Sequence, residues 1–215
     1  MQAKRELPLI IIVLLPFFYL IYIWEQLPDK VPMHWNIRGE IDRYGDKTEL
    51  ILLTVLLSLV TYIFFLVILK IDPKNKLRKM GHKFHVIKFL MTTFMSVLSL
   101  VIIISIKNAS LDNTNYYLLV GALYIVLGNY FKTIRPNYFI GIRTPWTLES
   151  ENVWKKTHKL GGLMWFAGGI VVVLSSLFLE RQMTVLILMI VTGIISIVPI
   201  IQSYVLYQNE KSLSH

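Results

Sequence analysis

The sequence predicts an all-α, polytopic integral membrane protein with six transmembrane helices and both termini in the cytoplasm. Three observations carry this prediction. Hydrophobic residues make up 55% of the 215 residues and charged residues only 16%, whereas an ordinary soluble domain carries roughly 25% charged residues. The apolar residues also fall into long uninterrupted runs, and most of the basic residues lie on alternate loops between those runs.

The apolar runs number six, and most of them approach the ~20 residues needed to cross about 30 Å of hydrocarbon. Each run is apolar on all sides, as expected of a helix surrounded by lipid. We predict spans at residues 7–24, 50–69, 86–106, 116–131, 161–179 and 184–207. The first run follows Lys4 and Arg5, but it is long and lacks a small-residue cleavage site, so we interpret it as an uncleaved helix.

The basic residues predict the orientation of these spans. Sixteen of the 22 Lys and Arg residues lie at the amino terminus, in the segments 70–88 and 132–159, and in the carboxyl-terminal tail. The remaining six lie on the alternate loops. By the positive-inside rule, both termini and the two basic segments face the cytoplasm. The formal net charge of +9 therefore orients helices, and we expect no direct nucleic-acid partner.

This arrangement of spans and loops divides the chain into three parts. Residues 1–70 form a two-helix unit with a long external loop, and residues 71–115 hold the basic cytoplasmic loop and the third helix. Residues 116–215 form a three-helix unit with a second long cytoplasmic loop.

The residue inventory excludes several classes of function. Without cysteine there is no disulfide, no thiolate metal site and no cysteine nucleophile. The apolar runs carry no ionisable residue near their middle, which argues against a proton or ion pump. His82 and His85 lack the spacing of a zinc protease. We therefore predict no enzymatic activity, no catalytic residues, no cofactor and no metal.

The external loop, residues 25–49, holds the first candidate site. Its main interpretation is a compact cap in which Asn36 and Asp42 bond the backbone of turns. Residues 33–35 are expected to be a short extended segment with Trp35 at the membrane interface. Two alternatives remain open, namely a surface for an external partner and a metal site built from His34 and nearby carboxylates. The residues singled out are His34, Trp35, Asn36, Gly39 and Asp42.

The internal segment 132–160 holds the second candidate site. A helix is expected over 148–160, with Thr147 as its N-cap and Gly161 just beyond its end. The main interpretation is an interfacial helix with Trp146 and Trp154 inserted in the bilayer. In the alternative, Arg135 and Arg143 bind lipid phosphate or a partner's carboxylates. The residues singled out are Arg135, Asn137, Gly141, Arg143, Pro145, Trp146, Trp154 and His158.

Both segments carry a family resemblance. Residues 32–42, PMHWNIRGEID, resemble the P-x-H-[WF]-N-x-x-G-x-x-D signature of a small bacterial membrane domain of unassigned function. Residues 135–147, RPNYFIGIRTPWT, followed by Trp154 and by HKLGG at 158–162, resemble the second-half signature of the SdpI family. The resemblance implies a multi-pass protein of the bacterial plasma membrane that protects the producing cell from a secreted, membrane-active peptide toxin.

The resemblance also implies a signalling role, in which the toxin-engaged protein holds a cytoplasmic transcriptional repressor at the membrane. The external residues would then face the toxin, and the cytoplasmic residues would contact the repressor or membrane lipids. Two other functions stay open at this point. One is a transporter or lipid-handling protein that uses Arg135 and Arg143, and the other is a membrane enzyme that uses His34 and Asp42.

Overall fold

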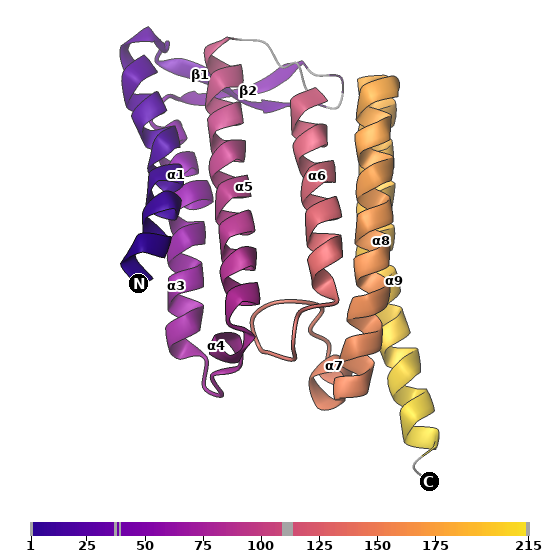
Figure 1. The fold of residues 1–215 in the computed structure, drawn as a ribbon. Helices are drawn as coiled ribbons and strands as arrows, with labels where there is room; N and C mark the ends of the chain where they lie inside the picture. Colours follow the sequence, from indigo (N-terminus) through magenta and orange to yellow (C-terminus); the bar gives the residue numbers. More distant parts are fainter. Residues whose placement is uncertain (1, 37, 39, 109–113, 214–215) are drawn as a thin grey trace. The chain divides into compact units, whose positions relative to one another are not determined.

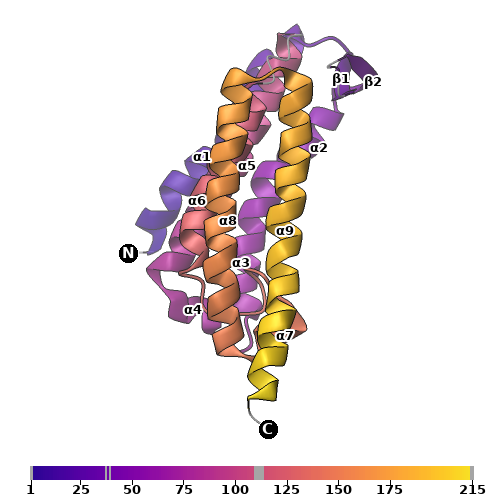
Figure 2. The same cartoon turned by 90° about the vertical axis from the view of Figure 1, so that its right-hand side faces the viewer.

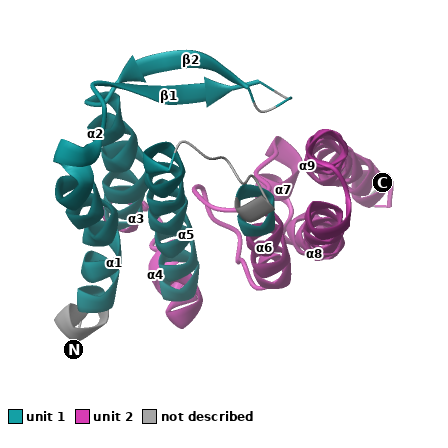
Figure 3. Ribbon diagram, turned by 90° about the horizontal axis from the view of Figure 1, so that it is seen from above, with its two compact units in different colours: residues 1–67, 85–119 teal, residues 68–84, 120–215 magenta. Residues whose placement is uncertain are grey.

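A computed structural model describes residues 2–36, 38, 40–108 and 114–213, and helices account for most of them (Figure 1). The residues group into two compact units (Figure 3). Unit 1 comprises residues 1–67 and 85–119, and unit 2 comprises residues 68–84 and 120–215. The helical architecture confirms the predicted all-α class, and the division into three parts stays a prediction.

Unit 1 is built around a buried apolar cluster at one end of its helices. Its elements are α1 (Gln2–Ile23), the 3-10 turn η1 (Trp24–Gln26), β1 (Lys30–Trp35), β2 (Ile41–Asp46), α2 (Glu49–Thr54), the π-helical segment η2 (Val55–Val60), most of α3 (Thr61–Ile71) and most of α5 (His82–Lys107). The cluster comprises Leu20, Ile23, Leu27, Val31, Leu50, Ile103 and Ile106. Because it joins α1, β1, α2 and α5, it anchors the hairpin on the helix ends.

Strands β1 and β2 form an antiparallel hairpin within the expected external loop. Lys30 pairs with Asp46 and Trp35 with Ile41, and the register shifts on both sides of His34. The sequence indicates extended structure only at residues 33–35, and the second strand was not expected. Its segment, IDRYGD, carries glycine and two aspartates, which are residues of low strand propensity.

A charged cluster lies inside unit 1, at the end of α1 remote from the hairpin. The Lys88 side chain is 3% exposed, and its ammonium lies 2.5 Å from a carboxylate oxygen of Glu6. The Tyr62 hydroxyl donates to the other oxygen of Glu6 at 3.0 Å. A buried cation is costly unless it is paired and hydrogen-bonded, so these three side chains depend on one another.

Unit 2 carries the second long loop on a scaffold of helices. Its elements are α4 (Lys76–Met80), most of α6 (Thr114–Phe131), α7 (Pro145–Glu149), α8 (Glu151–Phe178) and α9 (Arg181–Ser212). Helices α8 and α9 lie side by side after a short turn (Figure 2). The indole nitrogen of Trp165 donates to the carbonyl of Ile195 at 3.2 Å, which links the two helices.

Paired glycines bring α6 and α8 into backbone contact. A β-carbon on Gly162 would lie 2.7 Å from the carbonyl oxygen of Gly128, and one on Gly169 would lie 2.6 Å from that of Gly121. The glycines are seven residues apart on each helix and pair in antiparallel order. Small residues at such positions allow close approach of membrane helices, whose association depends on packing rather than on the hydrophobic effect.

Five helices in the described part of the chain are long and apolar enough to cross a membrane: Glu6–Gln26, Glu49–Ile71, His82–Lys107, Glu151–Phe178 and Arg181–Ser212. The apolar helix Tyr116–Phe131 is shorter. The structure therefore supports a membrane-embedded helical protein and five of the six predicted spans on length and composition. The sixth span stays a prediction.

The helix expected over residues 148–160 differs in the structure. Two helices meet at Ser150, which caps α8 by accepting the backbone N–H of Val153 at 3.2 Å. Helix α8 then continues through Gly161 and Gly162 to Phe178. The prediction that Gly161 ends the helix is wrong, because these glycines accommodate neighbouring side chains and the backbone of α6 rather than a left-handed cap.

Candidate functional site

An exposed pair of side chains, His34 and Asp42, lies on the hairpin in unit 1. Nδ1 of His34 lies 2.6 Å from a carboxylate oxygen of Asp42, and both side chains are exposed, by 64% and 43% respectively. The strand pairing brings the two residues together, because His34 on β1 pairs with Arg43 on β2, and Asp42 is the neighbour of Arg43 in the sequence. Asp42 therefore bonds a side chain rather than the turn backbone expected from the sequence. The pair presents an imidazole and a carboxylate to the surroundings.

Asn36 shapes the turn between the strands, as the sequence predicts. Its carbonyl oxygen accepts the backbone N–H groups of Arg38 at 2.9 Å and Glu40 at 3.0 Å. Its amide nitrogen donates to the Glu40 carboxylate at 2.8 Å. One side chain thus satisfies several groups of a tight turn. Gly39 lies outside the described residues.

Trp35 and Asp46 fasten the hairpin to the rest of unit 1. Trp35 packs against the buried apolar cluster. The side chain of Asp46 accepts the backbone N–H of Thr48 at 3.0 Å, and this bond holds the pKa of the carboxyl below its usual range. Across the described residues, no group of three or more His, Asp or Glu side chains converges as a metal site would require.

The second candidate site is the loop between α6 and α8 in unit 2, and Asn137 is its organiser. This side chain is fully buried. Its amide nitrogen donates to the carbonyls of Arg135 and Ile140, both at 2.9 Å, and its oxygen accepts the N–H groups of Phe139 and Ile140 at 2.8 and 2.7 Å. Because both ends of the amide are used, the turn has one well-defined shape.

His158 and Trp154 fix the same loop to α8. The two rings stack with centroids 4.1 Å apart, and the side-chain N–H of Trp154 donates to the carbonyl of Ile134 at 2.8 Å. Nδ1 of His158 lies 2.9 Å from the Trp154 carbonyl oxygen, and Nε2 accepts the backbone N–H of Ile142 at 3.0 Å. A carbonyl can only accept, so the imidazole is neutral, with its proton on Nδ1. The shared face predicted for Trp154 and His158 is confirmed.

Gly141 adopts the backbone geometry that this arrangement requires. Its φ of +107° lies in a region that side-chain-bearing residues rarely occupy. A β-carbon there would also collide with the His158 ring. The glycine therefore serves both the turn and the histidine contact.

Threonines that we did not single out as site residues complete the loop. Thr144 caps α7 by accepting the N–H of Thr147 at 3.2 Å, and the Thr147 hydroxyl accepts the N–H of Thr144 at 2.9 Å. The Thr144 hydroxyl also lies 3.1 Å from that of Ser203 on α9. The sequence carries a signal for this cap, because Pro145 suits the first position of a helix and so marks Thr144 as the N-cap. The expectation that Thr147 is the N-cap is wrong by one turn.

Burial divides the predicted loop residues into two groups. Asn137, Trp154 and His158 are buried and hold the shape of the loop. This corrects the interpretation of Trp154 as a bilayer anchor, because its ring stacks inside the protein. The indole of Trp146 packs edge-on against Tyr204, with centroids 5.0 Å apart. The residues left exposed for contact are Arg135, Arg143 and Pro145.

Basic side chains surround the exposed part of the loop within unit 2. The Arg143 guanidinium donates to the carbonyl of Tyr138. Lys74 and Lys76 lie 5.6 and 5.2 Å from the centroid of the Tyr138 ring. The Lys74 ammonium also holds the pKa of the Tyr138 phenol below its usual range. This surface is therefore suited to an anionic partner.

Two family models match the parts of the chain that contain the hairpin and the α6–α8 loop. Residues 133–203 match the model of the SdpI/YfhL protein family, and residues 11–59 match a domain of unknown function, DUF1648. The chain is 25% identical to Immunity protein SdpI of Bacillus subtilis (strain 168) over 210 residues, which cover 95% of this chain and 97% of the relative.

A second relative shares a shorter region. The chain is 36% identical over 66 residues to an uncharacterized protein of Archaeoglobus fulgidus, covering 31% of this chain and 36% of the relative. No solved structure matches the chain significantly.

Proposed function

Because the chain belongs to the SdpI/YfhL family, we propose that it protects the cell that makes it against a secreted, membrane-active peptide toxin. The observation that carries this proposal is the similarity to an immunity protein along nearly the whole length of both chains. That similarity includes the hairpin and the loop between α6 and α8. A protein made only of long apolar helices would need neither segment.

The proposed orientation places the hairpin outside the cell, with the α6–α8 loop and both termini in the cytoplasm of a multi-pass protein. The distribution of basic residues supports it, since 16 of the 22 lie on the proposed cytoplasmic side. Within unit 1, the amino-terminal residues of α1 and the hairpin lie at opposite ends of the helix, as this orientation requires (Figure 1).

The hairpin is the proposed contact for the toxin, through His34, Trp35, Asn36, Gly39 and Asp42. The exposed His34–Asp42 pair supports this role, because its polar groups are accessible to a partner. Asn36 has a different task, since its hydrogen bonds hold the turn that presents the pair.

The α6–α8 loop is the proposed contact for a cytoplasmic repressor. Its exposed residues Arg135, Arg143 and Pro145 support direct contact, whereas its buried residues hold the shape of that surface. Toxin bound outside would favour one of two packings of the helices and so change how this surface is presented.

Survival of toxin-challenged cells tests the immunity role, and induction of the genes that the repressor controls tests the signalling role. Arg143→Ala separates the two, because the side chain is exposed in the cytoplasmic loop. We expect this variant to protect cells while induction falls. Arg181→Ala is the matched control, since Arg181 lies at the start of α9, on the proposed external side. Equal induction by both variants at equal expression would contradict the assignment of Arg143.

A further inference from the structure

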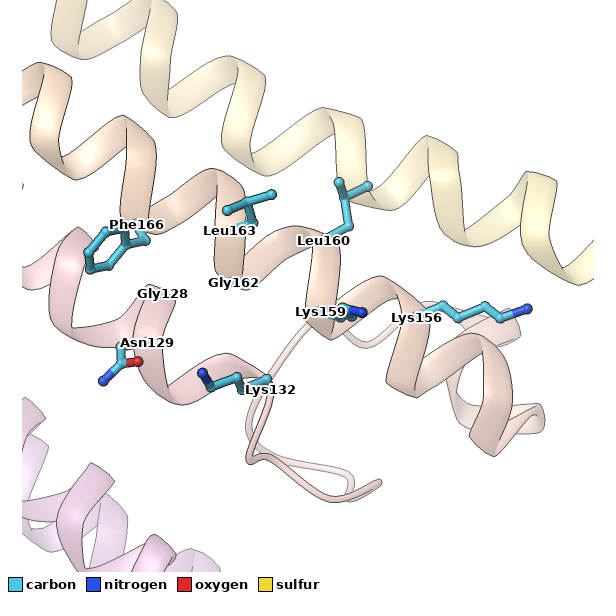
Figure 4. Close-up of a pocket in the computed structure, with 9 residues that line it drawn as sticks. All are labelled: Gly128, Asn129, Lys132, Lys156, Lys159, Leu160, Gly162, Leu163 and Phe166. Carbon is cyan, nitrogen blue, oxygen red and sulfur yellow. The ribbon is translucent and has the colours of Figure 1, made fainter.

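An apolar groove with a cationic end lies between α6 and α8 in unit 2 (Figure 4). It encloses about 560 Å³, within the range of roughly 300–1,000 Å³ typical of small-molecule sites. The phenyl ring of Phe166 lies toward one end, and Lys132, Lys156 and Lys159 lie toward the other. Gly128 and Gly162 form the floor, where the two backbones meet.

The cationic end of the groove offers ammonium groups to a ligand. Within the described residues, no carboxylate forms an ion pair with Lys132, Lys156 or Lys159, although neighbouring Lys155 is paired with Glu151 at 2.9 Å. Their charges are therefore available to a bound anion.

A second cavity, of about 600 Å³, shares Lys132 with the groove and strengthens its positive character. It is lined by Lys76, Lys79, Lys83, Arg135 and Lys155 together with a single acidic side chain, Glu151. Because Glu151 is already paired with Lys155, the cavity adds uncompensated positive charge beside the cationic end of the groove. Such a field favours a ligand with a phosphate group.

The lysines lie where the apolar stretches of the two helices begin. Lys132 immediately follows the apolar helix Tyr116–Phe131, and Lys159 immediately precedes the apolar part of α8. Leu163 and Phe166 continue the groove along α8 and are 67% and 40% exposed. The groove therefore has its cationic end where the apolar helices begin and its apolar channel beside them. This arrangement matches an amphiphile whose phosphate lies at the membrane interface and whose acyl chain lies in the bilayer.

We propose that this groove is a specific site for an anionic phospholipid. The phosphate of the lipid contacts Lys132, Lys156 and Lys159, and an acyl chain lies along Leu163 and Phe166. The proposal goes beyond immunity and does not rest on it. It gives unit 2 a bound lipid that bridges α6 and α8, the two helices that flank the candidate loop.

Lipid binding by the purified full-length chain in detergent tests this assignment. Phosphatidylglycerol, phosphatidylcholine with the same acyl chains, and glycerol 3-phosphate are titrated separately, and bound ligand is counted by native mass spectrometry. We expect phosphatidylglycerol to bind at least tenfold more tightly than phosphatidylcholine, because each basic residue near an anionic headgroup contributes roughly fivefold in affinity and three lysines line the site. Equal binding of the two lipids would overturn the proposal. Binding of glycerol 3-phosphate as tight as that of phosphatidylglycerol would also overturn it, in favour of a free-phosphate site.

Variants locate the site. The triple variant K132Q/K156Q/K159Q should lose the preference for phosphatidylglycerol, and K132R/K156R/K159R, which keeps the charges, should retain it. The matched control K70Q/R78Q/K211Q removes the same charge from exposed residues of unit 2 that line neither cavity. Retention of the preference by the glutamine triple, or equal losses in the glutamine triple and the control, would place the lipid elsewhere.

Discussion

Gly141 lies so close to the imidazole of His158 that a β-carbon on the glycine would come within 3.0 Å of Nε2. The same nitrogen accepts the backbone N–H of Ile142. The ring therefore occupies the space that a side chain at Gly141 would need, and it supports the next peptide group. The shape of the α6–α8 loop depends on both residues.

Substitution of Gly141 by alanine should destabilise unit 2 by roughly 1–3 kcal/mol, because the residue has a positive φ and faces the His158 ring. Thermal unfolding in detergent measures the change. Gly193→Ala is the matched control, since a β-carbon there meets no atom within 4 Å and alanine is the better helix former by about 1 kcal/mol. Equal unfolding temperatures for the two variants would contradict the account of the loop.

Substitution of His158 by leucine should open the loop between α6 and α8. Leucine fills the buried space but leaves the N–H of Ile142 without its acceptor, at a cost of roughly 1–3 kcal/mol. Limited proteolysis should therefore cleave the segment 135–147 faster than in the unsubstituted chain. His82→Leu, at an exposed position at the start of α5, should leave the cleavage rate unchanged. An unchanged rate of cleavage of the segment 135–147 in both variants would show that His158 does not stabilise the loop.

Substitution of Lys88 by methionine should destabilise unit 1 by roughly 3–5 kcal/mol, because the Glu6 carboxylate would lose the ammonium that is paired with it. Thermal unfolding of single and double variants measures the coupling. The double variant Glu6→Gln with Lys88→Met should recover part of the loss, and Lys83→Met, exposed on the same helix, should have little effect. Additive losses in the double variant would contradict a coupled pair.

Single cysteine substitutions test the proposed orientation. Because the natural chain contains no cysteine, each variant carries one thiol. Tyr44→Cys places a thiol at a site where the native side chain is 60% exposed on the hairpin, and Lys79→Cys places one on α4. A membrane-impermeant maleimide added to intact cells should label the first thiol and label the second only after lysis. The reverse pattern would place the hairpin in the cytoplasm.

The composition predicted the helices well and the loops only in part. Long apolar runs dictate membrane helices because no other element satisfies its backbone in lipid. By contrast, Gly161 and Gly162 fit either a helix end or a close helix contact. For Gly162 the choice depends on contact with Gly128, which is more than 30 residues away in the sequence. Local sequence carries no information about that contact.

Trp154 and the hairpin show the same limit. A tryptophan beside an apolar run suits the membrane interface, but the structure stacks this ring on His158 and bonds it to the carbonyl of Ile134. In the hairpin, the sequence indicated the Asn36 turn because the side chain bonds its own neighbours. The His34–Asp42 pair depends instead on the strand register, which the bulge at His34 shifts.

Survival of toxin-challenged cells tests the central claim most directly. The chain is expressed in a Bacillus subtilis 168 derivative that lacks Immunity protein SdpI, and colonies are counted after challenge with the toxin to which that protein confers immunity. We expect the unsubstituted chain and Glu25→Gln, a control at an exposed acidic residue preceding the hairpin, to restore survival. His34→Ala at equal expression should protect less well. Survival no better than with an empty vector for the unsubstituted chain, confirmed to be in the membrane, would contradict the immunity function.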